Sequence, residues 1–535
     1  MRSRKHRVLA FLLAVVMLFT GCSMEVPTVM KMLIASQMPV HFSDMEYTRP
    51  DVDGLLAAVE ACEEGAAGTN FDTLVQDVMD CLLYYHEFMT NYYLAQIRYS
   101  INMTDIYWTD EYNYCMDRSA EVSAAVDRML YTLADSPHRA ALESEEYFGA
   151  GYFDDYEGDS IWDDTFTSLM DRESDLLTEY YDLSAQTAEA NEQEMLDVYA
   201  VEFARILVEL VALRQEIAAY AGFESYHAFA YDYYYLRDYT PEQEAAYLAQ
   251  VRQELVPVYR ELYARGISGT EIHTCTEEET FAYTESVAEN MGGVVLEAFR
   301  RMEECGLYDI SMSENKYDAS FEVYLTIYGE PFVFVNPTGT EYDYLTFVHE
   351  FGHFSNDYAS MGAGKSIDVA EFFSQGLEYL SLFYGETDNP LDTLQMASSL
   401  SVYVEQSAYA DFEMRLYSTP VEELTTDRIF GILDAVCADY GFDDLGIDGR
   451  YLITIPHFYI APCYVFSYVA SNDAALQLYQ LELAESGAGR QKYVDNLVPA
   501  EYTFMAFLES AGLESPFAEG RIQSVAQTFR EFFGL

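Results

Sequence analysis

The chain has 535 residues, of which 50% are hydrophobic and 22% charged, so it can bury more than one core and is not disordered by composition. Its 28 Lys and Arg residues stand against 91 Asp and Glu residues, a formal net charge of -63. A surface this acidic repels phosphate backbones and argues against nucleic acid as a partner. We therefore expect a soluble, acidic, globular protein.

The N-terminus has the pattern of an export signal. An apolar run at residues 8–20 is too short to remain as a membrane span, and it follows the basic residues Arg2, Arg4, Lys5 and Arg7. Cys22, directly after Gly21, resembles the lipobox cysteine of bacterial lipoproteins, which is diacylated and becomes the new N-terminus. We predict a lipoprotein signal peptide at residues 1–22 and a linker at 23–50. The mature protein would be extracytoplasmic and lipid-anchored to the bacterial cell membrane through Cys22, or secreted if the cleavage is an ordinary one.

Most of the chain after residue 50 has helical periodicity. Apolar residues recur at spacings of three and four, and one helix is well marked by the cap sequence Thr240-Pro241-Glu242-Gln243. Residues 321–335 instead alternate in polarity on both sides of Gly329-Glu330-Pro331, which predicts a β-hairpin. From about residue 341 the helical pattern returns. The expected fold is mainly α with one small β-sheet.

The motif His349-Glu350-Phe351-Gly352-His353 carries the chemistry. In a helix, the two histidines project from one face, so both imidazoles can reach a single Zn²⁺ ion. Zinc lowers the pKa of water toward about 7, and Glu350 can take the released proton and pass it to the leaving amine. The sequence thus indicates one zinc ion with His349 and His353 as ligands and Glu350 as the catalytic base.

A catalytic zinc needs a third protein ligand and one open position. Downstream, Glu371 and Glu378 lie seven residues apart and face one side of a second predicted helix. Gly362 and Gly364 lie in the segment between the two helices, as a helix–loop–helix return requires. From the spacing alone, either glutamate could complete the site.

These motifs resemble those of the thimet oligopeptidase and oligoendopeptidase F group of zinc metallopeptidases. In that group the His-Glu-x-x-His helix is followed by a helix with Glu-x-x-Ser-Gln, whose Glu is the third zinc ligand, and this pattern falls on Glu371-Phe372-Phe373-Ser374-Gln375. The resemblance implies Glu371 as the ligand, with Glu378 in support. Glu371 follows His349 by 22 residues, which is shorter than we expect for the group. The implied fold is a helical, two-lobed peptidase with a deep channel and a small β-sheet next to the zinc helix.

Two further stretches resemble the oligoendopeptidase F branch. Residues 332–336 precede the zinc helix, as the substrate-edge strand of the group does. The run Ile455-Pro456-His457-Phe458-Tyr459, followed by Tyr464 and Tyr468, resembles its loop of a histidine and tyrosines. The resemblance implies catalytic roles for His457, Tyr464 and Tyr468, since neutral hydrogen-bond donors stabilise the oxyanion of peptide hydrolysis.

The resemblance covers about residues 210–510, where 221–226 and 237–241 are similar to the helical body of the group, and is only compositional before residue 210. We assign residues 51–200 to an N-terminal helical region and 201–535 to the catalytic zinc metallopeptidase domain.

The sequence favours a zinc endopeptidase that hydrolyses short unstructured oligopeptides held along residues 332–335. A carboxypeptidase or dipeptidyl carboxypeptidase is an alternative, but it would need a cation for the substrate's C-terminus, and Lys365 and Arg450 give little support for one. A peptide-binding lipoprotein without catalysis is the alternative from another class, and it would need neither Glu350 nor Glu371. The expected partners are oligopeptides and, through lipidated Cys22, the membrane, and we expect a monomer.

Overall fold

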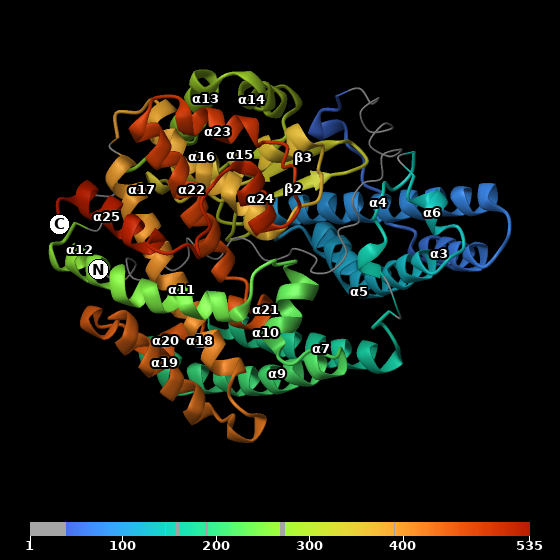
Figure 1. Cartoon of the computed structure of the whole chain (residues 1–535), viewed down its shortest axis with the longest axis horizontal. Helices are drawn as coiled ribbons and strands as arrows, with labels where there is room; N and C mark the ends of the chain where they lie inside the picture. Colours follow the sequence, from blue (N-terminus) through green and yellow to red (C-terminus); the bar gives the residue numbers. More distant parts are fainter. Residues whose placement is uncertain are drawn as a thin grey trace.

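The computed structural model describes residues 39–144, 146–156, 158, 160–187, 191–267, 273–389 and 391–535. The predicted signal peptide, Cys22 and most of the predicted linker lie outside these residues. Within them, no helix is both long and apolar enough to cross a membrane. The prediction of a mainly α fold with one small sheet is confirmed (Figure 1).

Three helices near the N-terminus form what we call the arm, on one side of the molecule in Figure 1. They are α3 (Val52–Ala66), α4 (Phe71–Ile101) and α5 (Ile106–Ala134). Asp51, Asn70 and Asp105 cap them, because each side chain accepts a hydrogen bond from an amide in the first turn. Their apolar faces share one core, which includes Leu55, Val59, Leu74, Val78, Leu82, Val126 and Leu130.

The helices that follow form the body that supports the site. They are α7 (Asp164–Gln186), α8 (Glu192–Glu194), α9 (Ala200–Tyr220), α10 (Tyr226–Phe229), α11 (Pro241–Glu254) and α12 (Val256–Ala264). The short helix α6 (Arg139–Leu142) instead packs with the arm, where Leu142 joins its core (Figure 1). The predicted cap of α11 is confirmed, since Thr240 and Gln243 each accept a hydrogen bond from the other's backbone amide. A π-helical turn, η5 (Ala230–Tyr234), follows α10.

A three-stranded sheet follows α13 (Glu277–Met291) and α14 (Gly293–Cys305). Its strands are β1 (Tyr308–Asp309), β2 (Phe321–Leu325) and β3 (Glu330–Phe334). β2 and β3 form the predicted hairpin, with Phe321 opposite Phe334. The turn requires a positive φ of 66° at Gly329, which glycine adopts without strain. β1 pairs in parallel with the other side of β3, so the order is β1-β3-β2.

This strand order corrects the expectation that residues 332–335 offer an edge to the substrate. β3 is the central strand: the amides of Val333 and Val335 donate to the carbonyls of Leu307 and Asp309 at 3.0 and 2.8 Å. Its other side pairs with β2 along the whole strand. Among the described residues no strand pairs with the outer side of β2. Alternating polarity predicts a hairpin but does not say which of its strands is the outer one.

Three central helices, α15 (Tyr342–Ser360), α16 (Ile367–Tyr384) and α22 (Phe466–Ala484), lie beside the sheet (Figure 1). α16 packs against both α15 and α22, and α15 contacts β2 and β3. α15 and α16 approach closely at Gly352, where a Cβ would lie 2.6 Å from the Cα of Ser374. The remaining helices are α17 (Leu391–Ser401), α18 (Ser407–Tyr417), α19 (Thr426–Tyr440), α20 (Gly449–Leu452), α21 (His457–Ile460), α23 (Ala488–Asp495), α24 (Phe504–Ala511) and α25 (Arg521–Phe533).

Candidate metal centre

Two helices bring the three predicted metal ligands together. His349 and His353 lie one turn apart on α15, and their ring centroids are 5.0 Å apart. Glu371, on α16, has its Oε2 atom 3.5 Å from His349 Nε2 and 3.9 Å from His353 Nε2. One donor atom from each of the three side chains lies within 4.8 Å of the others. Ligands about 2.0–2.1 Å from a tetrahedral zinc stand about 3.3 Å apart, so this donor set fits one such ion.

The two glutamates that the spacing leaves open have different places in the structure. Glu378 lies behind His349, whose Nδ1 donates a hydrogen bond to Glu378 Oε1 at 2.6 Å. This contact leaves Nε2 of the ring to face Glu371. A carboxylate on the outer ring nitrogen is the usual way in which a metal-binding histidine is oriented. The geometry therefore places Glu371 in the donor set and Glu378 in support of His349.

Each oxygen of the Glu371 carboxylate accepts a hydrogen bond. Ser374 Oγ donates to Oε2 at 3.1 Å, and the hydroxyl of Tyr464 donates to Oε1 at 3.1 Å. The Glu371 side chain is fully buried, so these two donors fix its orientation. Ser374 belongs to the Glu-x-x-Ser-Gln pattern, but the sequence analysis assigns it no role.

Burial and neighbouring charges set the protonation of this centre. Burial raises the pKa of Glu350 to about 8, and the charges of Glu371 and Glu378 add to this effect. Burial lowers the pKa of His349, but the hydrogen bond to Glu378 and the charge of Glu371 outweigh it and bring the pKa to about 9. Burial and the charge of His349 hold the pKa of His353 well below its ordinary value. At neutral pH the buried Glu350 thus favours its protonated form, and a divalent cation held by the three ligands would favour the carboxylate that can accept a proton.

Glu350 has the surroundings that a proton acceptor needs. Its side chain lies on the helix of both histidines and is 2% exposed. Its Oε2 atom has no hydrogen-bond partner among the described residues. A buried polar atom without a partner is uncommon in proteins, and here it leaves a lone pair free for a reacting group.

The predicted loop residues His457, Tyr464 and Tyr468 also lie together. The ring of His457 is 5.8 Å from that of Tyr464 and 6.0 Å from that of Tyr468, and the two tyrosine rings are 5.1 Å apart. Burial lowers the pKa of His457 to about 4 and raises the pKa of both tyrosines, so all three are neutral at pH 7 and can donate hydrogen bonds. Besides burial, the charge of Glu371 and, less, that of Glu350 raise the pKa of Tyr468.

Arg214, on α9, is a supporting residue that the sequence analysis missed. Its Nη1 donates to the Phe458 carbonyl at 3.0 Å and its Nη2 to the Tyr459 carbonyl, directly after His457. Its Nε donates to Glu173 at 2.6 Å. These bonds fix α21, a single turn, and with it the ring of His457. The sequence does indicate this role, because Arg214 lies inside an apolar stretch and a buried guanidinium requires partners.

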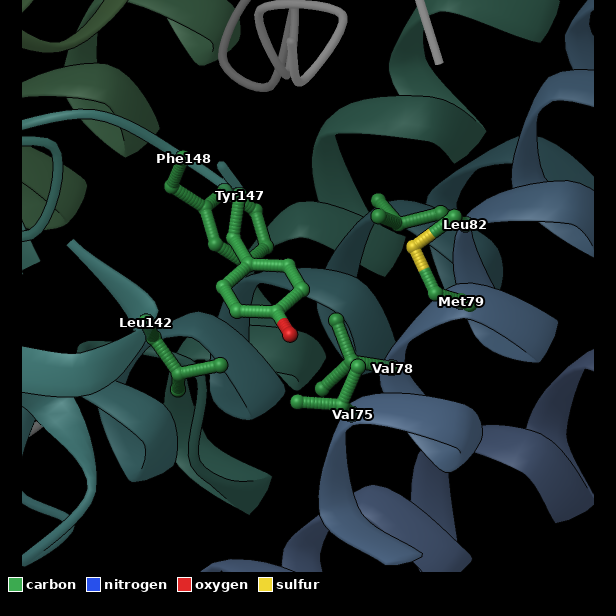
Figure 2. Close-up of a pocket in the computed structure, with 7 residues that line it drawn as sticks. All are labelled: Val75, Val78, Met79, Leu82, Leu142, Tyr147 and Phe148. Atoms are coloured by element: carbon green, nitrogen blue, oxygen red, sulfur yellow. The ribbon is translucent and has the colours of Figure 1, made fainter. Parts of the chain in front are cut away.

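An apolar crevice in the arm is separate from this chemistry. Figure 2 shows Tyr147 reaching over α4, and the crevice is lined by Val75, Val78, Met79, Leu82, Leu142, Tyr147 and Phe148. It contains no carboxylate or imidazole. The crevice therefore belongs to the packing of the arm.

Comparisons with known proteins agree with this architecture. Residues 42–160 match the Peptidase M3 N-terminal domain family. PZ peptidase A in complex with an inhibitor superposes with a TM-score of 0.78 at 20% identity, over 92% of this chain and 99% of that one. A Bacillus anthracis str. Ames protein assigned provisionally as oligoendopeptidase F gives 0.77 at 21%, over 93% and 99%. A further protein with the same provisional assignment gives 0.79 at 20%, over 92% and 99%. The sequence has no significant match among curated proteins.

The fold is thus that of the oligoendopeptidase F peptidases, and the resemblance noted in the sequence is confirmed. The family match lies in residues 42–160, before residue 210, where the sequence shows only a compositional likeness. That region carries no catalytic motif.

Proposed function

We propose that this protein is a zinc-dependent endopeptidase of short, unstructured oligopeptides. The observation that carries the proposal is the convergence of His349, His353 and Glu371 from two helices, with the unpartnered carboxylate oxygen of Glu350 beside them. Zinc, when bound, would polarise the scissile carbonyl and lower the pKa of the attacking water.

The chain's own residues then perform the proton transfers. Glu350 accepts the proton of the attacking water and donates it to the leaving amine. His349, His353 and Glu371 would hold the ion, and Glu378 keeps the Nε2 atom of His349 directed at it. Because Glu350 lies in a buried site, the proton stays within the reacting groups rather than passing to bulk water.

The loop residues stabilise the developing negative charge. Tyr468 and His457 are neutral donors beside Tyr464, and they favour the oxyanion more than the ground-state carbonyl. Tyr464 donates to Glu371 in this structure, so its role includes holding that carboxylate.

The substrate would bind along β2 rather than β3. An extended peptide adds to a sheet at a free edge, where backbone amides and carbonyls remain available. β2 is the outer strand of the hairpin and precedes the zinc helix α15 in the chain. A folded protein has already paired its backbone and cannot add in this way, so we expect only unstructured peptides to be cleaved.

The structure also helps to decide between an endopeptidase, a carboxypeptidase and a peptide-binding protein without catalysis. The two cations weighed from the sequence as anchors for a substrate C-terminus are both paired: Lys365 with Asp357, and Arg450 with Asp448 at 2.7 Å. This pairing favours an endopeptidase over a carboxypeptidase. A peptide-binding protein without catalysis has no use for a buried carboxylate next to two histidines.

Mass spectrometry of cleavage products tests the proposal. Peptides of roughly five to twenty residues, the size that a recessed site admits, are offered with a free and with an amidated C-terminus. An endopeptidase cleaves both forms internally, and a chelator stops it. Cleavage of the free form alone would indicate a carboxypeptidase, and no cleavage with measurable binding would indicate a binding protein.

We further propose that the enzyme is a monomer held outside the cytoplasm by lipidated Cys22. Two acyl chains are needed for stable anchoring, because one chain binds only marginally. Labelling with a fatty-acid analogue should mark the wild type but not Cys22→Ser, which should appear in the medium. Release of the wild type into the medium would contradict the anchor.

A further inference from the structure

A segment of the body far from the zinc motif reaches into the centre. It follows the π-helical turn η5 and contains Leu236 at a φ of 50°, in the left-handed region that a leucine rarely adopts. The side chain of Leu236 is 41% exposed, whereas Tyr235 and Arg237 on either side are buried. The strained residue thus turns both neighbours inward. Strained backbone and π-helical turns are common where a chain must place functional groups.

Arg237 holds the first turn of α16. Its Nε lies 3.8 Å from Asp368 Oδ2, and neither side chain has exposed area. The Tyr239 hydroxyl donates to the same oxygen at 3.0 Å. Asp368 precedes Glu371 by three residues, so the two carboxylates lie on neighbouring positions of one helix. The contact fixes the part of α16 that carries the proposed metal ligand.

The same side chain holds the turn that carries the tyrosines. Arg237 Nη2 donates to Ser467 Oγ at 2.8 Å and to the Tyr464 carbonyl at 3.4 Å. The Tyr235 hydroxyl donates to the Pro462 carbonyl at 2.7 Å. Between these contacts lies Cys463 with a φ of 67°, so the turn is strained and depends on its surroundings to persist.

The charge of Arg237 is costly to bury. Three aromatic rings surround its guanidinium, with centroids at 4.5 Å for Tyr231, 4.8 Å for Tyr235 and 5.5 Å for Tyr239. Even so, its Nε and Nη1 atoms have no hydrogen-bond partner among the described residues. Buried ion pairs contribute little net stability compared with apolar packing. A role in stability alone therefore does not account for this arrangement.

We propose that Arg237 is a positioning residue that sets the distance between the Glu371 carboxylate and the hydroxyls of Tyr464 and Tyr468. It does so by placing its charge beside Asp368 while its Nη2 donates to the turn at Ser467, and the rigid, planar guanidinium fixes the distance between these two contacts. The inference rests on the proposed function and deepens it, because the two groups it aligns are the metal ligand and the oxyanion donors.

Arg237→Lys tests this role, with Arg521→Lys as the matched control. Arg521 is a buried arginine paired with Asp473 at 2.5 Å, outside the centre, so its replacement reports the stability loss alone. We expect Arg237→Lys to keep bound zinc and a KM within about 3-fold of wild type, with kcat reduced about 10-fold or more. Arg521→Lys should lower Tm but leave kcat unchanged. Equal kcat values for the two variants would overturn the proposal.

A double-mutant cycle with Tyr464→Phe shows whether Arg237 acts through the tyrosine turn. If it does, Arg237→Lys costs less than about 3-fold in the Tyr464→Phe background, because the aligned group is already gone. Additive effects would contradict the proposal.

Should Arg237→Lys fold poorly, Ser467→Ala removes one partner of the same contact and should lower kcat without changing bound zinc. A wild type without zinc or activity would refute the proposed function itself, whereas an active wild type with a normal Arg237→Lys refutes the positioning role alone.

Discussion

The arm and the central helices are both buried helical assemblies, but they bury different side chains. The core that α3, α4 and α5 share in the arm is mainly apolar, and its two buried carboxylates have partners: Glu111 pairs with Arg49, and Asp127 accepts a hydrogen bond from Ser160. The central helices instead bury Glu350, Asp368 and Glu371, each at most 2% exposed. Burying a carboxylate is costly unless partners compensate for it, whereas burying leucine is favourable. The arm thus contributes packing, and the central helices retain polar groups whose protonation and partners serve chemistry.

The largest expected effect comes from removing a proposed metal ligand from the central helices. Glu371→Ala should lose zinc at equimolar metal and with it all measurable turnover, because two histidines alone hold the ion poorly. Glu378→Gln, the matched control, should keep zinc with an affinity reduced by about 10–100-fold. Zinc content after gel filtration measures both. Zinc loss from Glu378→Gln with retention in Glu371→Ala would reverse the two assignments.

Replacing the base should separate activity from metal binding. Glu350→Gln keeps the shape of the side chain but cannot accept the proton, so kcat should fall by at least about 10²-fold. Bound zinc should remain at one ion per chain, and Tm should not fall, since a buried carboxylate with an unpartnered oxygen has been neutralised. Turnover and zinc content are measured on the same sample. A Glu350→Gln protein with most of its activity would rule out the proton-transfer role.

A substitution in the arm should lower stability and leave kcat unchanged. Leu82 is fully buried at the crevice of Figure 2, and Leu82→Ala should lower the free energy of unfolding by about 2–5 kcal/mol through the cavity it leaves. Its kcat, measured well below the melting temperature, should equal that of wild type. Leu82→Met, which conserves volume, should cost less than about 1.5 kcal/mol. A large fall in kcat for Leu82→Ala would show that the arm participates in the chemistry.

Much of the site could be predicted because its signals are local. The four-residue spacing of His349 and His353 defines one helix face, and the alternation at residues 321–335 defines a hairpin. The capping sequence at Thr240 likewise marks a helix start that the structure confirms.

The parts that could not be predicted depend on contacts between distant segments. Arg237 and Asp368 are far apart in the chain, and no pattern in either segment indicates that they meet. The hydrogen bond from Tyr464 to Glu371 is likewise tertiary, so spacing could not rank the two tyrosines. Which strand of the hairpin is outer depends on β1, a two-residue strand too short to predict.

The last expected effect, on stability alone, concerns Glu413, a buried carboxyl on α18. Burial raises the pKa of Glu413 to about 8, so between its ordinary pKa and pH 8 the folded state binds a proton that the unfolded chain has released. Stability should therefore fall as pH rises through this window, by at most about 1.4 kcal/mol per unit. Glu413→Gln keeps an acceptor for the Cys463 amide, which bonds to Glu413 at 2.9 Å, and should lack this loss. Thermal melts at pH 5 and 8 compare the two proteins, and equal shifts in Tm would contradict the raised pKa.

The most direct test of the central claim is a crystal structure of Glu350→Gln with zinc and an oligopeptide, with data collected at the zinc absorption edge. The account predicts one anomalous peak about 2.0–2.2 Å from the imidazoles of His349 and His353 and from the Glu371 carboxylate. It also predicts that the peptide pairs with the outer side of β2. A peak ligated by Glu378 in place of Glu371, or no peak at these residues, would contradict the assignment of this centre as a catalytic zinc site.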